Sequence, residues 1–158
     1  GVKKFVDECE KNGVDGLIIV DLQPEEDAEL FNELKKNSIS LIRLITPTTN
    51  ESRLKLILNN ASGFLYYVTI TGITGQHSAN LKELEKSIKT IKIHSNLPVM
   101  AGFGIKDAND VKEICSIADG AVVGSSIVNI IEKNLNNKDK MLKSIDVFTK
   151  NLKLGTEI

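Results

Sequence analysis

Hydrophobic residues follow two alternating patterns along this chain. Stretches in which they recur every three or four positions, as on one face of a helix, are each followed by a short continuous apolar run, as in a buried strand. We expect strands at five such runs: 16–21, 41–45, 64–69, 99–101 and 121–123. A helical stretch precedes each run, and two more follow the last, a short one from about Ser126 and a longer one that carries Met141 and Leu152. Continuously apolar strands predict a parallel sheet that is buried on both faces.

The spacing of these units limits the fold class. One unit occupies roughly 20 to 30 residues, which is typical of a (β/α)8 barrel and equally of a doubly wound α/β sheet. No low-complexity linker divides the chain, and the longest polar stretch, 132–140, is expected to end one helix and lead into the next. We therefore expect one α/β domain over residues 1–158, and periodicity alone does not choose between the two architectures.

Composition argues against two classes of partner. The 158 residues include 20 basic and 21 acidic side chains, two Tyr and no Trp, so the basic surface and the aromatic platform that nucleic-acid binding usually needs are both missing. No apolar run approaches the ~20 residues that span a bilayer, so we expect no membrane insertion. Cys9 and Cys115 lie far apart, with no second Cys or His at metal-ligand spacing. This pattern indicates buried reduced thiols, no metal site and a cytoplasmic protein.

Glycines mark the carboxyl ends of the last two strands, where ligands bind in both candidate architectures. The segment 102–105 follows the fourth strand, and the segment 124–127 follows the fifth and opens a short helix. A phosphate needs several backbone N–H donors at close range, which glycine and a helix N-terminus provide. The pair of turns therefore predicts a phosphate site, although either alone would be read as an ordinary tight turn. The loop 71–77, with Gly75, offers a further donor or only another turn.

Titratable residues give a weaker signal. Asp21 ends the first strand and is either an acid or base or a turn residue, and Tyr66 either packs in the core or faces a ligand. His77 and His94 are expected at the surface. No two carboxylates stand at consecutive strand ends, and no nucleophile has a partnered base. The residues thus indicate binding but no catalytic group.

Five ordered segments carry a resemblance to a known family. They are 13–22 with 24–26, 46–49, 63–67 with 71–75, 102–105, and 119–120 with 124–128. Together they closely resemble the alpha subunits of tryptophan synthase, in order and spacing, over essentially all 158 residues. The resemblance implies a (β/α)8 TIM barrel, of which this chain is expected to supply the C-terminal portion, strands four to eight, with the N-terminal portion absent. A barrel of this type typically needs about 250 residues, so 158 would be a little over half.

What the resemblance implies about activity is a lyase of tryptophan biosynthesis. It cleaves indole-3-glycerol phosphate by a retro-aldol reaction into indole and glyceraldehyde 3-phosphate. In the family the phosphate is held at positions that match Gly75, Gly104, Gly124 and Ser125. Positions that line the indole pocket match Tyr66, Thr74 and Phe103, with Leu44 and Val122 as further apolar wall.

The family's catalytic Glu and Asp match no segment here, so the resemblance implies no catalytic residue in this chain and no activity of the segment alone. It also implies no cofactor here, because pyridoxal phosphate belongs to the beta subunit that joins the alpha subunit in an alpha2beta2 complex.

Two other functions stay open. Other phosphate-binding barrel enzymes, of histidine, tryptophan or pentose metabolism, would need a catalytic carboxylate, for which Asp21 is the sole candidate. Alternatively, the chain is an inactive truncated binding partner. Against its independence, the apolar runs 17–20 and 121–123 would form two unpaired sheet edges, which favour association.

Overall fold

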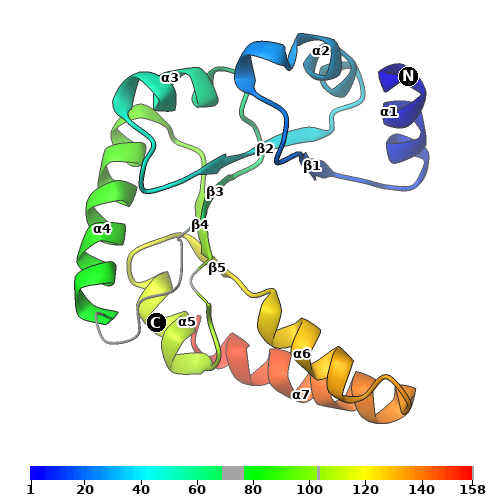
Figure 1. Ribbon diagram of the computed structural model, residues 1–158, viewed down its shortest axis with the longest axis vertical. Coiled ribbons are helices and arrows are strands. Elements are labelled where there is room, and N and C mark those ends of the chain that lie inside the picture. Colours follow the sequence, from blue (N-terminus) through cyan, green and yellow to red (C-terminus); the bar gives the residue numbers. More distant parts are fainter. Residues whose placement is uncertain (69–76, 103, 158) are drawn as a thin grey trace.

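Five parallel strands form a single sheet and lie in it in the order in which they occur along the chain (Figure 1). The computed structural model describes residues 1–68, 77–102 and 104–157. The strands are β1 Gly16–Ile18, β2 Ser40–Ile45, β3 Leu65–Val68, β4 Val99–Gly102 and β5 Gly120–Val122. Each strand pairs with the next one in parallel, as the apolar runs predicted. β1 and β5 are therefore the two edges of the described sheet.

Helices connect the strands and pack on one face of the sheet. They are α1 Val2–Lys11, α2 Ala28–Lys36, α3 Glu51–Asn59, α4 His77–His94, α5 Ala108–Cys115, α6 Ser125–Lys133 and α7 Lys138–Leu154, with a short 3-10 helix, η1 Pro24–Glu26. Several begin where a side chain accepts the first free N–H groups: Asn50 caps α3, Asp107 caps α5 and Asn137 caps α7. The resulting order of elements is that of a partial (β/α)8 barrel.

The hydrophobic core lies between the sheet and these helices. Alternate residues of the central strands, such as Leu65 and Tyr67 of β3 and Val99 and Ala101 of β4, are fully buried against α3, α4 and α5. A second cluster joins α1 and α2 to the first strands and contains Cys9. Cys9 and Cys115 are both free thiols, as expected, although Cys115 is only half-buried.

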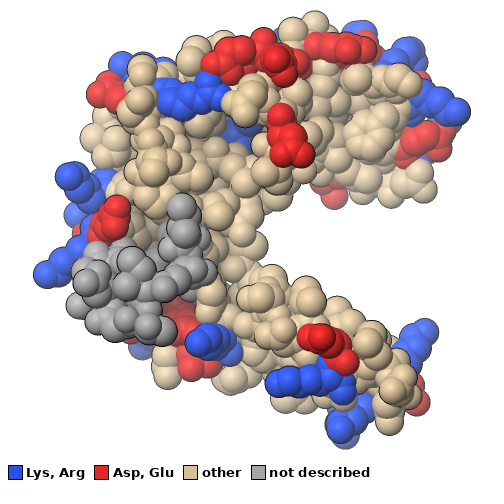
Figure 2. All heavy atoms as spheres, viewed as in Figure 1, with Lys and Arg blue, Asp and Glu red and all other residues tan. Residues whose placement is uncertain are grey.

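The other face of the sheet is concave. The chain curves into a partial ring that is open on one side (Figure 1), and the space-filling view shows this side hollowed and lined mostly by uncharged residues (Figure 2). The expectation that both faces of the sheet are covered is therefore wrong for the described residues: Ile18 of β1 is 44% exposed, and Leu44, Tyr66 and Val122 on the other strands are only half-buried. The reason is geometric, because the inner face of a barrel is covered by strands across the ring and not by helices.

The first unit also differs from its expected boundaries. β1 ends at Ile18, because the backbone then turns, with the N–H of Leu22 donating to the carbonyl of Ile19. Asp21 consequently lies in an exposed loop beyond the strand and does not end it. Among the described residues, no helix is both long and apolar enough to cross a membrane, and no cluster of His, Cys, Asp and Glu could hold a metal ion.

Candidate binding site at the carboxyl ends of the strands

The glycine turns after β4 and β5 lie side by side at the carboxyl edge of the sheet. Gly104 has a φ of +63°, a left-handed conformation that side chains disfavour. Gly124 caps the amino end of α6, where no side chain accepts the first N–H groups. A Cβ added at Gly124 would meet open space. Both positions are exposed, so their backbone is open to a ligand.

Ser126 ties these two turns together. Its hydroxyl donates a 2.6 Å hydrogen bond to the carbonyl of Ile105, one residue beyond Gly104. The first intrahelical bond of α6 runs from the N–H of Ile127 to the carbonyl of Gly124. The N–H groups of Ser125 and Ser126 therefore precede the helical hydrogen bonds and point out of the helix end, which suits an anion. Ser126 was not singled out from the sequence, since its role depends on a residue 21 positions away.

An apolar wall continues from this edge along the concave face. Leu44 pairs with Tyr66 in register across β2 and β3, and Val122 pairs with Gly102 across β4 and β5. A Cβ at Gly102 would lie only 2.7 Å from the hydroxyl oxygen of Tyr66, so this glycine makes room for the ring. Leu44, Tyr66 and Val122 are all half-buried.

The two neighbouring tyrosines of β3 face opposite ways, which the sequence left open. Tyr67 is 1% exposed, its hydroxyl donates to Ser87 of α4 at 3.0 Å, and burial raises the pKa of its phenol. Tyr66 lies on the concave face, so it is the tyrosine that a ligand could touch. Three expected site residues, Thr74, Gly75 and Phe103, lie outside the described residues.

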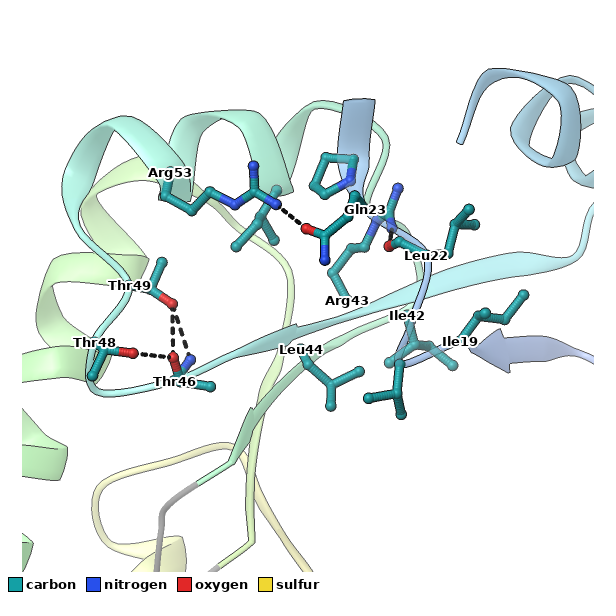
Figure 3. Close-up of a pocket in the computed structure, with 13 residues that line it drawn as sticks. Ile19, Leu22, Gln23, Ile42, Arg43, Leu44, Thr46, Thr48, Thr49 and Arg53 are labelled. Atoms are coloured by element: carbon teal, nitrogen blue, oxygen red, sulfur yellow. Dashed lines mark hydrogen bonds between the residues drawn. The ribbon is translucent and has the colours of Figure 1, made fainter. Parts of the chain in front are cut away.

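A pocket lies at the carboxyl ends of β1 and β2. It has a volume of ≈ 370 Å³, and its lining includes Gln23, Arg43, Leu44, Thr46, Thr49 and Arg53 (Figure 3). Ile42 and Leu44 point to one side of β2 and Arg43 to the other (Figure 3). The pocket thus joins the apolar wall at Leu44 to a polar rim.

The two arginines of this rim are already paired. Arg43 is 5% exposed and forms a buried ion pair with Asp27, which is 2% exposed. Arg53 pairs with Glu25 and also donates to the side chain of Gln23. Burial lowers the pKa of the Arg43 guanidinium, and the positive charge of Arg53 lowers it further.

Sequence reasoning missed this cluster. An Arg inside the apolar run 41–45 was the available signal, because a charge on a buried strand requires a partner. Of the titratable residues that the sequence did suggest, Asp21 is exposed and does not line the pocket. His94 is half-buried, with its Nε2 3.7 Å from Glu51, and α4 begins at His77.

A family model and several solved structures point to one family. The family model described as "Tryptophan synthase alpha chain" matches residues 1–157. The structure of tryptophan synthase subunit alpha from Campylobacter jejuni is 36% identical, with 94% of this chain and 59% of that chain covered and a TM-score of 0.83. That of the alpha subunit from Legionella pneumophila str. Paris is 30% identical, with 99% and 57% covered and a TM-score of 0.86.

A third similar structure comes from a tryptophan synthase a2b2 complex of Pyrococcus furiosus. It is 29% identical, with 96% of this chain and 60% of that chain covered and a TM-score of 0.82. The present chain therefore spans less than two thirds of the length of each of these relatives.

Proposed function

Because this chain belongs to the tryptophan synthase alpha chain family, we propose that it forms the substrate-binding side of a lyase that cleaves indole-3-glycerol phosphate. The reaction is a retro-aldol cleavage that breaks the carbon–carbon bond between the indole ring and the glycerol phosphate chain. Its products are indole and glyceraldehyde 3-phosphate. In the complete protein, residues 1–158 form strands four to eight of a (β/α)8 barrel. They are the C-terminal part of that single domain.

The phosphate end of the site carries this proposal. Gly104 and the Gly124–Ser125 turn lie on adjacent strand ends, and Ser126 holds them together. In many (β/α)8 barrels the loops after the last two strands, with a short extra helix, hold the phosphate of the substrate. α6 is that helix, and its free N–H groups and N-terminal partial positive charge suit a phosphate dianion. Gly75 is assigned to the same site from the family resemblance alone.

The indole end rests on the concave face. Leu44, Tyr66 and Val122 offer the apolar wall for a flat aromatic ring, and Thr74 and Phe103 are assigned to it from the resemblance. A ligand about the length of indole-3-glycerol phosphate would then lie along the carboxyl edge of the sheet from β2 to β5.

No acid–base residue is assigned to this chain. Asp21, the one carboxylate that a different phosphate-binding barrel enzyme could use here, gains no support from its exposed position outside the pocket. We propose that the catalytic Glu and Asp belong to the N-terminal part of the complete barrel, so the 158-residue segment binds phosphate but does not cleave substrate alone.

We further propose that the complete protein passes indole to a beta subunit in an alpha2beta2 complex. The alpha chain needs no cofactor of its own in this scheme, because pyridoxal phosphate belongs to the beta subunit. The Pyrococcus furiosus relative belongs to a tryptophan synthase a2b2 complex, which supports the assembly by similarity.

The test uses the complete natural polypeptide that carries these residues. Ser125→Ala keeps the backbone N–H but removes the hydroxyl, which in this proposal also donates to the phosphate. It should raise the KM for indole-3-glycerol phosphate about tenfold with kcat nearly unchanged, because that hydrogen bond to a charged group is lost from uniform binding. Formation of glyceraldehyde 3-phosphate is measured. Ser52→Ala is the matched control, since Ser52 is likewise exposed in the first turn of a nine-residue helix, α3. An equal KM in the parent and in Ser125→Ala would reject the assigned phosphate site.

A further inference from the structure

The chain contains only two arginines, against many lysines, and both reach the same segment. We define the β1 loop as residues 19–23, which connect β1 to η1. Arg43 donates through Nη1 to the backbone carbonyl of Leu22 at 3.1 Å. Arg53 donates to the side chain of Gln23. The loop is thus held at two successive residues, once by its backbone and once by a side chain.

Arg43 is the buried member of this arrangement. Its other terminal nitrogen, Nη2, pairs with Asp27, and Asp27 in turn accepts a 2.9 Å hydrogen bond from Asn60 at the end of α3. One guanidinium therefore connects β2, the β1 loop and the junction of α2 and α3. Only the fork of an arginine offers two rigid donor directions for such a connection, whereas a lysine ammonium is a point charge on a flexible stem.

Filling the space between β2 and the start of α2 does not require the Arg43–Asp27 ion pair. A buried ion pair is commonly no more stable than apolar residues of similar volume, because both charges lose their hydration. The Nε of Arg43 is also buried without a hydrogen-bond partner in the described structure, which adds to this cost. What an apolar pair could not supply is the bond to the carbonyl of Leu22.

The β1 loop is one wall of the pocket at the ends of β1 and β2. Ile19, Val20 and Leu22 line it together with Leu44, the residue placed at the indole end of the proposed site. The opposite wall belongs to β2 itself, from which Arg43 extends (Figure 3). The distance between the loop and β2 therefore fixes the width of the pocket beside Leu44.

We propose that Arg43 is a positioning residue which, held by Asp27, fixes the β1 loop against β2 and so sets the apolar wall for the indole end of the substrate. This inference rests on the proposed function for its substrate. Its structural part, the fixation of residues 19–23, does not depend on that function.

The experiment separates the tether to Leu22 from the burial of charge. In the complete natural polypeptide, Arg43→Met leaves Asp27 unpaired and should lower Tm by about 10 °C. The double variant Arg43→Met/Asp27→Leu removes both charges and should restore Tm to within a few degrees of the parent. Both variants lack the bond to Leu22, so both should raise the KM for indole-3-glycerol phosphate about tenfold.

Two further measurements show where the effect lies. Inhibition by inorganic phosphate should be unchanged in the double variant, because the glycine turns are at the other side of the sheet. Hydrogen exchange of residues 19–23 should become faster in the same variant. Lys92→Met is the matched control, because it also removes a cation from an ion pair, with Asp119, but at the amino ends of the strands. It should change neither the KM nor the exchange of residues 19–23.

A double variant with the parental KM and the parental hydrogen exchange would overturn the proposal. A double variant in which inhibition by inorganic phosphate weakens as much as the KM rises would also overturn it, because this would indicate a general disturbance of the fold. If the parent protein does not cleave indole-3-glycerol phosphate, the proposed function fails. The exchange of residues 19–23 then decides by itself whether Arg43 fixes the loop.

Discussion

The β1–β2 side and the β4–β5 side of the described sheet have ion pairs between separate elements at opposite ends of the strands. On the β1–β2 side, Arg43 and Arg53 gather at the carboxyl end and are paired with acidic residues there. On the β4–β5 side, the charged pair is Lys92 and Asp119, and it lies at the amino end, where Asp119 also accepts from the N–H of Val99. At the carboxyl end of that side, the proposed phosphate site consists of glycine and serine backbone, and the next charged residues, Lys106 and Asp107, lie exposed just before α5.

The two sides therefore offer a negatively charged ligand different conditions. A guanidinium that already has a carboxylate partner gives little to an incoming anion, because the anion would compete with that partner. At the start of α6 no side-chain cap accepts from the backbone N–H groups, and a Cβ built on Gly124 would meet open space. We infer that the β1–β2 side determines the shape of the site and the β4–β5 side supplies its electrostatic attraction.

Substitution of Gly104 and of Gly124 tests whether the two glycine turns of the β4–β5 side differ in how much they contribute to stability. Gly104→Ala should lower the free energy of unfolding by about 1–2 kcal/mol, because a Cβ is disfavoured at its φ of +63°. Gly124→Ala should cost less than about 1 kcal/mol, because its φ is negative and the added Cβ meets open space. Both should weaken inhibition by inorganic phosphate. Urea unfolding measures the stabilities, and equal losses for the two variants would contradict the different roles.

The link between the two turns gives a smaller expected effect. Ser126→Ala removes the hydrogen bond to the carbonyl of Ile105 and should cost about 1 kcal/mol of unfolding free energy. It should also weaken phosphate inhibition a few-fold, because the turns are then held less rigidly. Ser116→Ala is the matched control, as its hydroxyl donates to the carbonyl of Glu113 away from the site. Equal phosphate inhibition in the parent and in Ser126→Ala would show that the link has no part in binding.

Local patterns were sufficient to predict much of this fold. The five strands, their parallel order and the helices between them followed from apolar periodicity, because each element buries its own residues against the same core. The glycine turns could be located for a similar reason, since a residue without a Cβ and a helix start are both local signals. Family resemblance then selected the barrel over the doubly wound sheet, which periodicity could not do.

Long-range features could not be predicted in this way. Arg43 and Asp27 are separated by 16 positions, and an apolar pattern does not show which charged residues will meet. The directions of Tyr66 and Tyr67 were open because both belong to one continuous run. The exposure of Ile18 depends on what lies across the ring, which no residue of the run itself determines.

We expect acid pH to weaken the ion pair of Asp119 at the amino end of the β4–β5 side and to leave the glycine turns at its carboxyl end unchanged. Burial raises the pKa of the Asp119 carboxyl, but the hydrogen bonds from Lys92 and from the N–H of Val99 outweigh this and hold it below the ordinary value of 3.8. Because the pKa of Asp119 is lower in the folded than in the unfolded chain, its ionised carboxyl stabilises the fold at pH values above 3.8. This contribution is lost as the pH falls through the folded-state pKa.

Lys92→Met should therefore raise the pKa of Asp119 and lower the free energy of unfolding at pH 7. The pair is partly exposed, so solvent screening keeps the loss below about 1 kcal/mol. The difference from the parent should shrink below pH 3.8, where Asp119 becomes protonated in the unfolded chain and then in the folded one. NMR titration of the carboxyl and urea unfolding at both pH values measure this. A loss of phosphate inhibition in the same variant would contradict the separation of the two ends, because it would connect the charge at the amino end to the site at the carboxyl end.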